Sequence, residues 1–127
     1  MSTPQPRSQK LVLIDDDEDL RFTIGLSLRD AGLDVLELAS ADEALIEVRR
    51  ERPAAIFLDY HIDGMTAPSF VEALRSEGFG DVPVVLLTGS QNIGEIAAEM
   101  KVSDALAKPF DLDELVRRAK KAMAANR

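Results

Sequence analysis

The stretch LVLIDDD at residues 11–17 places four consecutive apolar side chains directly before three aspartates. The same pattern, four apolar residues followed by a polar one, occurs twice more, as AIFLD at residues 55–59 and as VVLLT at residues 84–88. Short apolar runs without alternation are typical of strands that are buried on both faces of a parallel sheet. The three stretches therefore predict three central parallel strands, each followed by a polar side chain.

Two weaker strand candidates accompany the central three. At residues 34–39 (DVLELA) acids interrupt the apolar side chains, and residues 104–107 (DALA) are small and polar. Such patterns suit strands that are less completely buried. We therefore expect one edge strand on each side of the three central strands.

Amphipathic segments lie between the strand candidates. The sequences at residues 40–43 (SADE) and 111–114 (DLDE) each form a capping box before helix-spaced apolar residues. Thr66 is a third N-cap candidate, and residues 93–100 form a short helical segment weakened by a glycine. These features predict a helix after each of the last four strands.

Residues 20–28 carry an ambiguous pattern. Apolar and polar side chains alternate strictly, which taken alone predicts a strand. Acids at residues 17–19 and Gly32 after the segment are helix signals, and two parallel neighbours need a crossover between them. We therefore expect a helix, with Phe22 and Leu26 on the side opposite its apolar face.

Strand and helix candidates thus alternate along the chain in five pairs. This order predicts an α/β fold, a doubly wound five-stranded parallel sheet of order 2-1-3-4-5 with five helices on its two faces. A site in such a sheet lies beyond the carboxyl ends of the strands, between the first and third. We expect one domain over residues 10–127, after a disordered tail at residues 1–9 that holds two prolines.

Composition narrows the function classes. The chain has 127 residues, with 15 Lys and Arg against 23 Asp and Glu, for a net charge of −8. No cysteine is present, which excludes disulfides, thiolate metal sites and cysteine nucleophiles. The acidic balance disfavours nucleic acid and anionic membranes as partners, and no apolar run reaches the roughly 18 residues of a membrane span. We expect a cytoplasmic domain that is a monomer or weak dimer.

The polar residues after the central and fifth strands are the candidate site. They are the aspartates at residues 15–17, Asp59, Thr88 and Lys108. Two carboxylates about 4 Å apart repel by roughly 4 kcal/mol at an effective dielectric near 20, and a bound cation relieves this repulsion. Oxygen ligands favour Mg²⁺, and an aspartate beside Mg²⁺ with a hydroxyl and an ammonium group suits phosphoryl transfer.

Four motifs in this order, LVLIDD, IFLD, VVLLT and AKPF, resemble those of a response-regulator receiver domain of bacterial two-component signalling. The resemblance covers residues 10–124 and implies the flavodoxin-like receiver fold. It implies that Asp59 accepts a phosphoryl group from a phosphohistidine on a histidine kinase or histidine phosphotransfer protein. The domain would then be a phosphorelay shuttle, or a switch that binds an unidentified protein target according to its phosphorylation.

The resemblance also implies a magnesium site. Asp15, Asp16 and Asp59 would hold Mg²⁺ together with the backbone carbonyl of His61, with Asp15 acting partly through water. The imidazole of His61 is either a solvated loop side chain or a group that tunes hydrolysis of the acyl phosphate. Asp17 is expected to be the N-cap of the first helix.

Two further residues complete the implied site. Thr88 would bind a phosphoryl oxygen and reorient on phosphorylation, and Lys108 would pair with the phosphoryl group. The bond between Lys108 and Pro109 is expected to be cis.

A kinase-docking surface is a separate expectation, formed by Leu20, Phe22, Leu26 and Pro109. An exposed apolar pair at Phe22 and Leu26 would suit a kinase helix. Neighbouring loops could instead cover the pair.

The chain departs from the family pattern at four places, one of which is a segment between Thr88 and Lys108 that is about two residues short. Asp63 replaces a common proline and should loosen its loop, and Thr66-Ala67 replaces a usual Asp-Gly. Ala105 replaces a Tyr or Phe whose rotation reports phosphorylation in the family. We therefore expect the phosphoryl chemistry to be retained and the usual signalling coupling to be altered.

Three rival functions use the same acidic residues. A receiver-like binding module would signal without phosphorylation. An aspartyl-phosphate hydrolase would use the first acidic motif, but it needs a further acidic pair after a later strand. A calcium loop fails because Leu20 occupies the position that needs glycine. Few residues follow the last helix, so we expect a stand-alone regulator that is not an enzyme beyond its own phosphorylation and dephosphorylation.

Overall fold

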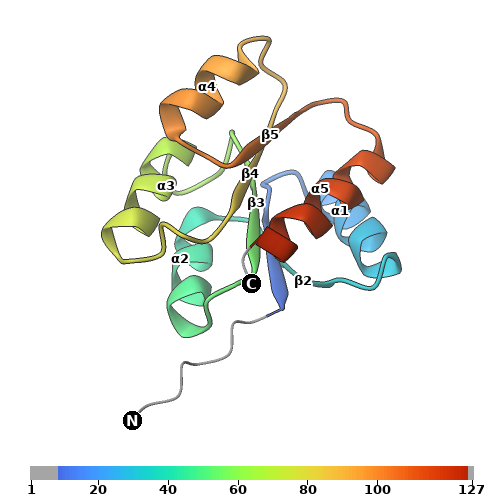
Figure 1. The fold of residues 1–127 in the computed structure, drawn as a ribbon, viewed down its shortest axis with the longest axis horizontal. Helices are drawn as coiled ribbons and strands as arrows, with labels where there is room; N and C mark the ends of the chain where they lie inside the picture. The colour runs from blue at the N-terminus through green and yellow to red at the C-terminus, as the bar shows by residue number, and fades with distance from the viewer. Residues whose placement is uncertain (1–8, 126–127) are drawn as a thin grey trace.

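A computed structural model of the chain describes residues 9–125, which form five strands alternating with five helices (Figure 1). The strands are β1 (Lys10–Ile14), β2 (Asp34–Leu38), β3 (Ala55–Asp59), β4 (Val84–Thr88) and β5 (Asp104–Ala107). The helices are α1 (Glu18–Asp30), α2 (Ala41–Arg50), α3 (Ala67–Ser76), α4 (Ile93–Met100) and α5 (Leu112–Ala125). The tail predicted to be disordered lies outside the described residues, apart from its last residue.

The strands form one parallel sheet in the order β2-β1-β3-β4-β5, which confirms the predicted fold class and strand order. Two central strands extend one residue further than their apolar runs. Asp59 pairs with Leu87, and Thr88 pairs with Ala107, so both polar residues are the last members of their strands. The sheet itself therefore fixes the backbone at these two positions.

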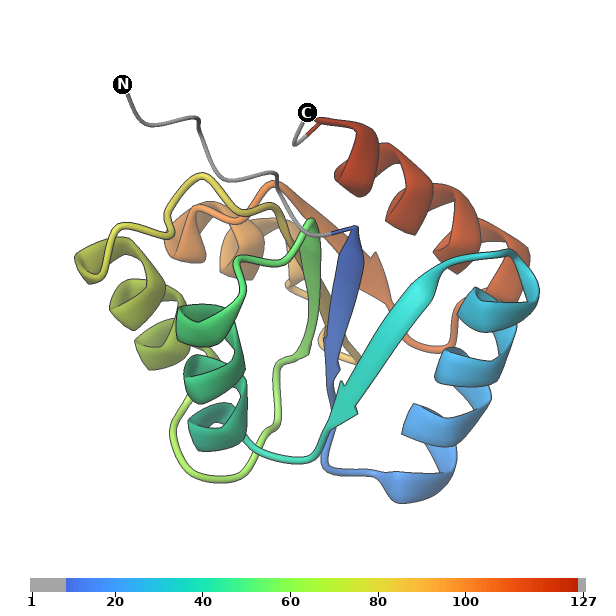
Figure 2. The ribbon, with the colours of Figure 1, turned by 90° about the horizontal axis from the view of Figure 1, so that it is seen from below.

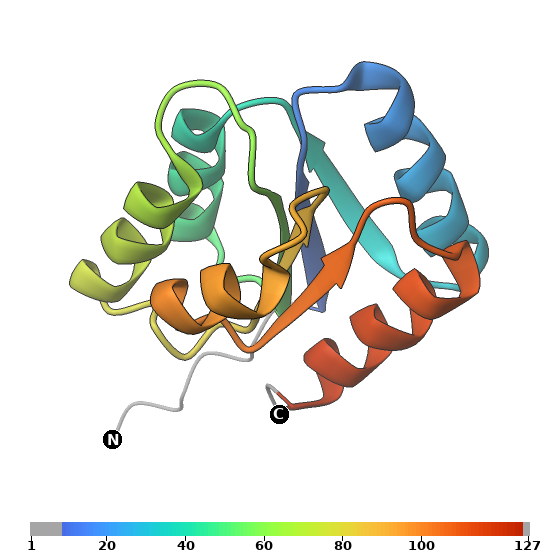
Figure 3. The same cartoon turned by 90° about the horizontal axis from the view of Figure 1, so that it is seen from above.

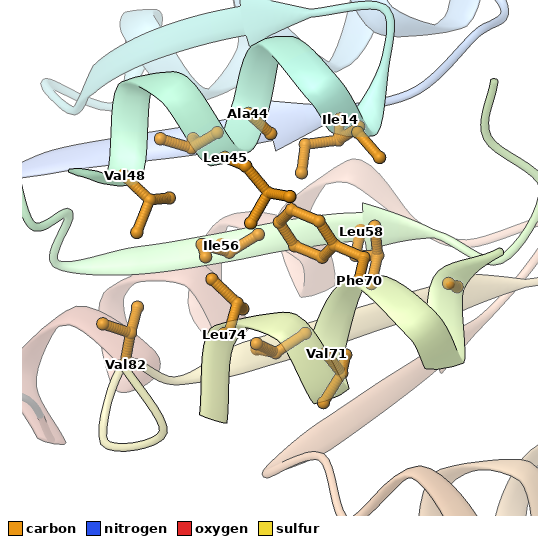
Figure 4. Packing of buried hydrophobic residues seen from close by; sticks show 14 of the residues in the cluster. Ile14, Ala44, Leu45, Val48, Ile56, Leu58, Phe70, Val71, Leu74 and Val82 are labelled. Carbon is orange, nitrogen blue, oxygen red and sulfur yellow. The ribbon is translucent and has the colours of Figure 1, made fainter. Parts of the chain in front are cut away.

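Helices cover both faces of the sheet. Figures 2 and 3 show α1 and α5 on one face and α2, α3 and α4 on the other. Alternate side chains of each strand point to opposite faces, so Val12 and Ile14 join one buried cluster while Leu11 and Leu13 join the other. In Figure 4, side chains of α2 and α3, Phe70 among them, point toward each other and onto β3. Burial on both sides explains why the central strands are uninterrupted apolar runs.

The ambiguous first segment is a helix. The side chain of Asp17 accepts a hydrogen bond from the backbone N–H of Leu20 at 3.1 Å and caps the helix N-terminus. Ile24 and Leu28 are fully buried, whereas Phe22 is 62% exposed. The strict alternation therefore places apolar side chains on two sides of a helix and does not mark a strand.

Capping groups set the starts of the other helices. Ser40 Oγ and Thr66 Oγ1 accept hydrogen bonds from backbone N–H groups three residues onward, at 3.3 and 3.2 Å. Asp111 Oδ1 accepts from the N–H of Asp113 at 2.9 Å before α5. Asn92, which precedes α4, makes no side-chain capping bond. The N-terminus of α4 is thus the least supported of the five, as its short and glycine-containing sequence predicts.

The lengths and compositions of the helices bear on whether one of them could cross a membrane. Among the helices of residues 9–125, none combines the length and the apolar character that crossing a bilayer requires.

Candidate functional site

The carboxyl ends of the strands bring the predicted site residues to one edge of the sheet (Figure 3). Asp15 directly follows β1, Asp59 ends β3, Thr88 ends β4, and Lys108 directly follows β5. The loop after β1 leads to a helix on one face, and the loop after β3 leads to a helix on the other. The residues therefore meet at the switch point that the strand order predicts.

Three carboxylates form the centre of this site. Oxygens of Asp15, Asp16 and Asp59 lie within 4.8 Å of one another. Asp15 is 0% exposed and Asp59 is 4% exposed, whereas Asp16 is open to solvent. The Asp15 Oδ1 atom accepts a hydrogen bond from the N–H of Asp17 at 2.9 Å, and Asp59 Oδ1 accepts from the N–H of His61 at 3.1 Å. Backbone donors thus hold one oxygen of each buried carboxylate.

Lys108 provides the positive charge of the site. Its Nζ atom donates a hydrogen bond to Asp59 Oδ2 at 2.8 Å and lies 3.7 Å from Asp15 Oδ2. Its backbone N–H donates to the carbonyl of Thr88 at 2.8 Å, which anchors the end of β5 to β4. The bond between Lys108 and Pro109 is cis, as expected. One ammonium group therefore lies beside two of the three carboxylates.

Burial makes the ionised form of Asp15 unfavourable. Loss of solvent raises the pKa of this carboxyl to about 6, and the neighbouring Asp59 also raises the pKa. The hydrogen bond from Asp17 and the charge of Lys108 act in the opposite direction and do not cancel the effect of burial. The site therefore has an excess of negative charge that its own residues do not neutralise.

One oxygen of the site also lacks a donor. Among the side-chain atoms of the described residues, only Asp15 Oδ2 is buried without a hydrogen-bond partner. An unsatisfied buried oxygen is costly unless another group binds it. A hard divalent cation fits this donor set, because carboxylate oxygens are the ligands that Mg²⁺ prefers.

Thr88 and His61 border the acidic centre. Thr88 is 1% exposed, and its Oγ1 accepts a hydrogen bond from the N–H of Ser90 at 3.1 Å. The His61 side chain is exposed, and its ring meets that of Tyr60 edge to face with centroids 5.4 Å apart. A cleft of about 570 Å³ lies beside Asp16 along the loop of residues 60–66. The centre is therefore open to an approaching partner on this side.

The loop after β3 is tethered, although Asp63 was expected to loosen it. The backbone carbonyl of Asp63 accepts a hydrogen bond from the N–H of Ala41 at 3.1 Å, and Asp63 forms a parallel bridge with Ser40. This contact needs only backbone groups, so the loop before α2 supports this segment from the side whatever residue stands at position 63. The expected loosening of the loop by Asp63 stays a prediction.

Arg21 is a site residue that the sequence did not reveal. Its Nη1 atom donates a hydrogen bond to the backbone carbonyl of Asp15 at 2.6 Å, and its Nε lies 3.9 Å from Glu37 of β2. The only sequence signal is its place one turn after the Asp17 cap, on a helix that begins beside β1. Arg21 therefore ties α1 to the backbone that carries the first acidic residue.

The four residues expected to bind a partner differ in exposure. Phe22 is 62% and Leu26 is 49% exposed, so neighbouring loops do not cover this pair. Leu20 is half-buried and packs against the core, while Pro109 is exposed. Ala105, where the family pattern has an aromatic residue, is half-buried against the cluster that includes α3 and α4.

Comparisons with known proteins agree with this geometry. A family described as the response regulator receiver domain matches residues 11–120. The chain is 36% identical over 115 residues to the transcriptional regulatory protein PrrA of Mycobacterium tuberculosis, covering 89% of the chain and 49% of that protein. It is 30% identical over 120 residues to the DNA-binding response regulator MtrA of Mycolicibacterium smegmatis, covering 93% and 52%. The chain thus spans about half the length of these relatives.

Solved structures show the same similarity. A putative response regulator from Chloroflexus aurantiacus has a TM-score of 0.84 and 32% identity, covering 93% of this chain and 99% of that one. The receiver domain of the sensor histidine kinase PA1611 from Pseudomonas aeruginosa has a TM-score of 0.83 and 28% identity, covering 92% and 98%. In that second structure a magnesium ion is coordinated in the active-site cleft.

Proposed function

This chain belongs to the response regulator receiver domain family, and on that premise we propose that Asp59 accepts a phosphoryl group from a phosphohistidine. The donor is a histidine kinase or a histidine phosphotransfer protein. The observation that carries the proposal is the position of Asp59, buried at the end of β3, 2.8 Å from the Lys108 ammonium and beside two further carboxylates. A buried aspartate held in this way suits nucleophilic attack on phosphorus.

The reaction forms a bond between a carboxylate oxygen of Asp59 and phosphorus as the nitrogen–phosphorus bond of the donor breaks. The leaving imidazole takes up a proton, and Asp59 becomes an acyl phosphate. Lys108 is placed to balance the charge of the phosphoryl oxygens. Thr88 Oγ1 accepts from Ser90, which leaves its own hydroxyl proton free to donate to a phosphoryl oxygen.

Asp15, Asp16, Asp59 and the backbone carbonyl of His61 are the groups that would hold Mg²⁺. The unpartnered Asp15 Oδ2 atom and the surplus of carboxylates support this assignment. When bound, the ion neutralises negative charge on the carboxylates and on the transferring phosphoryl oxygens. The contribution of the chain is to fix three oxygen ligands at one sheet edge before the donor arrives.

The output of the phosphorylated domain is a protein contact. We place the chain in the cytoplasm as a phosphorelay shuttle or phosphorylation-dependent binding switch, a monomer or weak dimer, without enzymatic turnover of an outside substrate by this domain. The net charge of −8 supports protein partners over nucleic acid for this domain. The exposed pair Phe22 and Leu26 on α1 supports a kinase-docking role for that surface, to which we also assign Leu20 and Pro109.

Intact mass after incubation with Mg²⁺ and acetyl phosphate tests the proposal. The wild type should gain the mass of one phosphoryl group, and Asp59→Asn should gain none. Asp63→Asn is the matched control, because Asp63 is an exposed aspartate in the same loop. Equal labelling of Asp59→Asn contradicts the proposal. A wild type that neither acetyl phosphate nor a phosphohistidine protein labels points instead to a module that signals without phosphorylation.

A further inference from the structure

A second cavity lies at the amino edge of the sheet, away from the acidic centre. Its volume is about 380 Å³, within the range of small-molecule sites. Residues from four elements or their connections line it, among them Leu74, Val84, Val102, Arg118, Lys121 and Ala122. Val84 begins β4 and Thr88 ends it, so at about 3.3 Å per residue the two sites lie roughly 13 Å apart along that strand. We call this space the amino-edge cavity.

We propose that the amino-edge cavity binds a small amphipathic anion, a carboxylate carried on a short acyl chain or a single ring. This proposal goes beyond the proposed phosphoryl chemistry and does not depend on Asp59. It is carried by an apolar floor under a rim whose positive charge the chain leaves unbalanced.

The floor of the cavity is apolar and ordered by the core. Leu74 of α3, Val82 before β4 and Val84 of β4 are 1%, 4% and 5% exposed. Phe79 and Val102 line the walls and are half-buried. Burying an apolar ligand body here removes further apolar surface from water, worth about 25 cal/mol per Å².

The rim is positively charged within a chain that is acidic as a whole. Arg75, Lys101, Arg118 and Lys121 line the cavity, against Asp81 and Asp104. Arg118 Nη1 binds Asp104 Oδ1 at 2.5 Å, and Asp81 forms an ion pair with Arg52. The two acids are therefore neutralised by arginines and do not compete for the lysines.

Two lysines of the rim have no acidic partner among the residues that the structure describes. Within residues 9–125, neither Lys101 nor Lys121 forms an ion pair, and both side chains are exposed. Arg75 donates a hydrogen bond to the backbone carbonyl of Lys101 at 2.8 Å, which holds the end of α4 at the cavity. The backbone of Lys101 is therefore fixed at the rim, and an anion that enters the cavity meets the ammonium groups of Lys101 and Lys121.

Three probes that share the same octyl chain but differ in the charge of the head group separate the contributions of apolar contact and charge to binding. Octanoate, octanol and octylamine are titrated into the ¹⁵N-labelled 127-residue chain without phosphodonor, and backbone amide shifts are followed. Octanoate should cause saturable shifts centred on residues 79–84 and 101–104. Octanol should bind more weakly, and octylamine should not bind there.

Charge variants test the rim directly. Lys101→Gln combined with Lys121→Gln should weaken octanoate binding about fivefold, as the loss of two exposed charge pairs predicts. Lys120→Gln is the matched control, an exposed lysine of α5 that does not line the cavity, and should leave the affinity unchanged. Because both rim lysines are exposed, the double variant should keep the wild-type free energy of unfolding, which urea titration checks.

Three results would overturn the proposal. One is the absence of saturable octanoate shifts at the cavity. Another is equal binding of octanol or octylamine, which would show that the lysines of the rim do not select an anion. The third is an effect of Lys120→Gln as large as that of the double variant, which would show general attraction of anions to α5.

Discussion

Replacing Asp15 with asparagine should stabilise the protein in the absence of divalent metal. No donor among residues 9–125 reaches the Oδ2 atom of the buried carboxyl, which also lies beside a second carboxylate. Asparagine keeps the oxygen that accepts from the N–H of Asp17 and places an uncharged amide at the other position. The substitution therefore removes an unfavourable charge with little change of shape.

The size of the effect follows from the pKa of Asp15. Burial raises this pKa from 3.8 to about 6, and a difference of one in pKa corresponds to about 1.4 kcal/mol. Keeping the carboxyl ionised above pH 7 thus lowers the free energy of unfolding by about 3 kcal/mol. The folded state binds this proton more tightly than the unfolded state does. The destabilisation is therefore absent below about pH 4, and the free energy of unfolding of the wild type falls as the pH rises through about 6.

Urea unfolding followed by circular dichroism measures this effect. In EDTA at pH 7.5, Asp15→Asn should exceed the wild type by about 2 to 3 kcal/mol, and the difference should shrink toward zero near pH 4. Added Mg²⁺ should stabilise the wild type more than the variant and narrow the difference. Asp63→Asn, at an exposed position, should change stability by less than about 0.5 kcal/mol. Two results would show that burial of the Asp15 charge does not destabilise the protein. One is an Asp15→Asn protein that is no more stable than the wild type at pH 7.5, and the other is a stability difference that does not change with pH.

Two further sets of variants test the docking surface on α1 and the packing of α1 against β2. Phe22→Ser combined with Leu26→Ser should slow phosphotransfer from the kinase while sparing labelling by acetyl phosphate. Ile46→Ser, which changes an exposed apolar residue of α2, should change neither rate. Equal rates of phosphotransfer from the kinase to the double variant and to the wild type would exclude docking at α1. Gly25→Ala should raise the free energy of unfolding by about 1 kcal/mol in a Glu37→Ala background, because alanine has a higher helix propensity than glycine. The gain should be much smaller in the wild type, because the added Cβ would lie 2.4 Å from Glu37 Oε2. Urea titration of the four proteins gives both values, and an equal gain in the two backgrounds would contradict this contact.

Most of the fold was predictable because burial leaves a strong pattern in the sequence. Runs such as residues 11–14 are apolar without interruption since each strand is covered on both faces. Residues 20–28 were the exception, where alternation gave the wrong local signal. The decision for a helix came from Asp17, Gly32 and the need for a crossover, and the structure confirms it.

The acidic centre was predictable for a related reason. Asp15 and Asp59 follow apolar runs at strand ends, and parallel strands bring such ends together. The unsatisfied Oδ2 atom of Asp15 and the hydrogen bond from Arg21 depend on side-chain rotamers, which no sequence pattern encodes. The amino-edge cavity is similar, because segments far apart in the chain form it.

An altered coupling between phosphorylation and output stays a prediction for this chain. Ala105 offers no aromatic ring at the position where the family pattern has one, and the segment that follows Thr88 leads to a short, weakly capped α4.

Chemical mapping of the phosphorylated residue tests the central claim most directly. The chain is incubated with Mg²⁺ and a phosphorylated histidine phosphotransfer protein, treated with borohydride, and digested for peptide mass spectrometry. Borohydride reduces an acyl phosphate, so the account predicts homoserine at position 59 and unmodified aspartate at Asp15 and Asp16. Homoserine at another acidic residue, or donor protein that loses its phosphoryl group without homoserine at position 59, would contradict it.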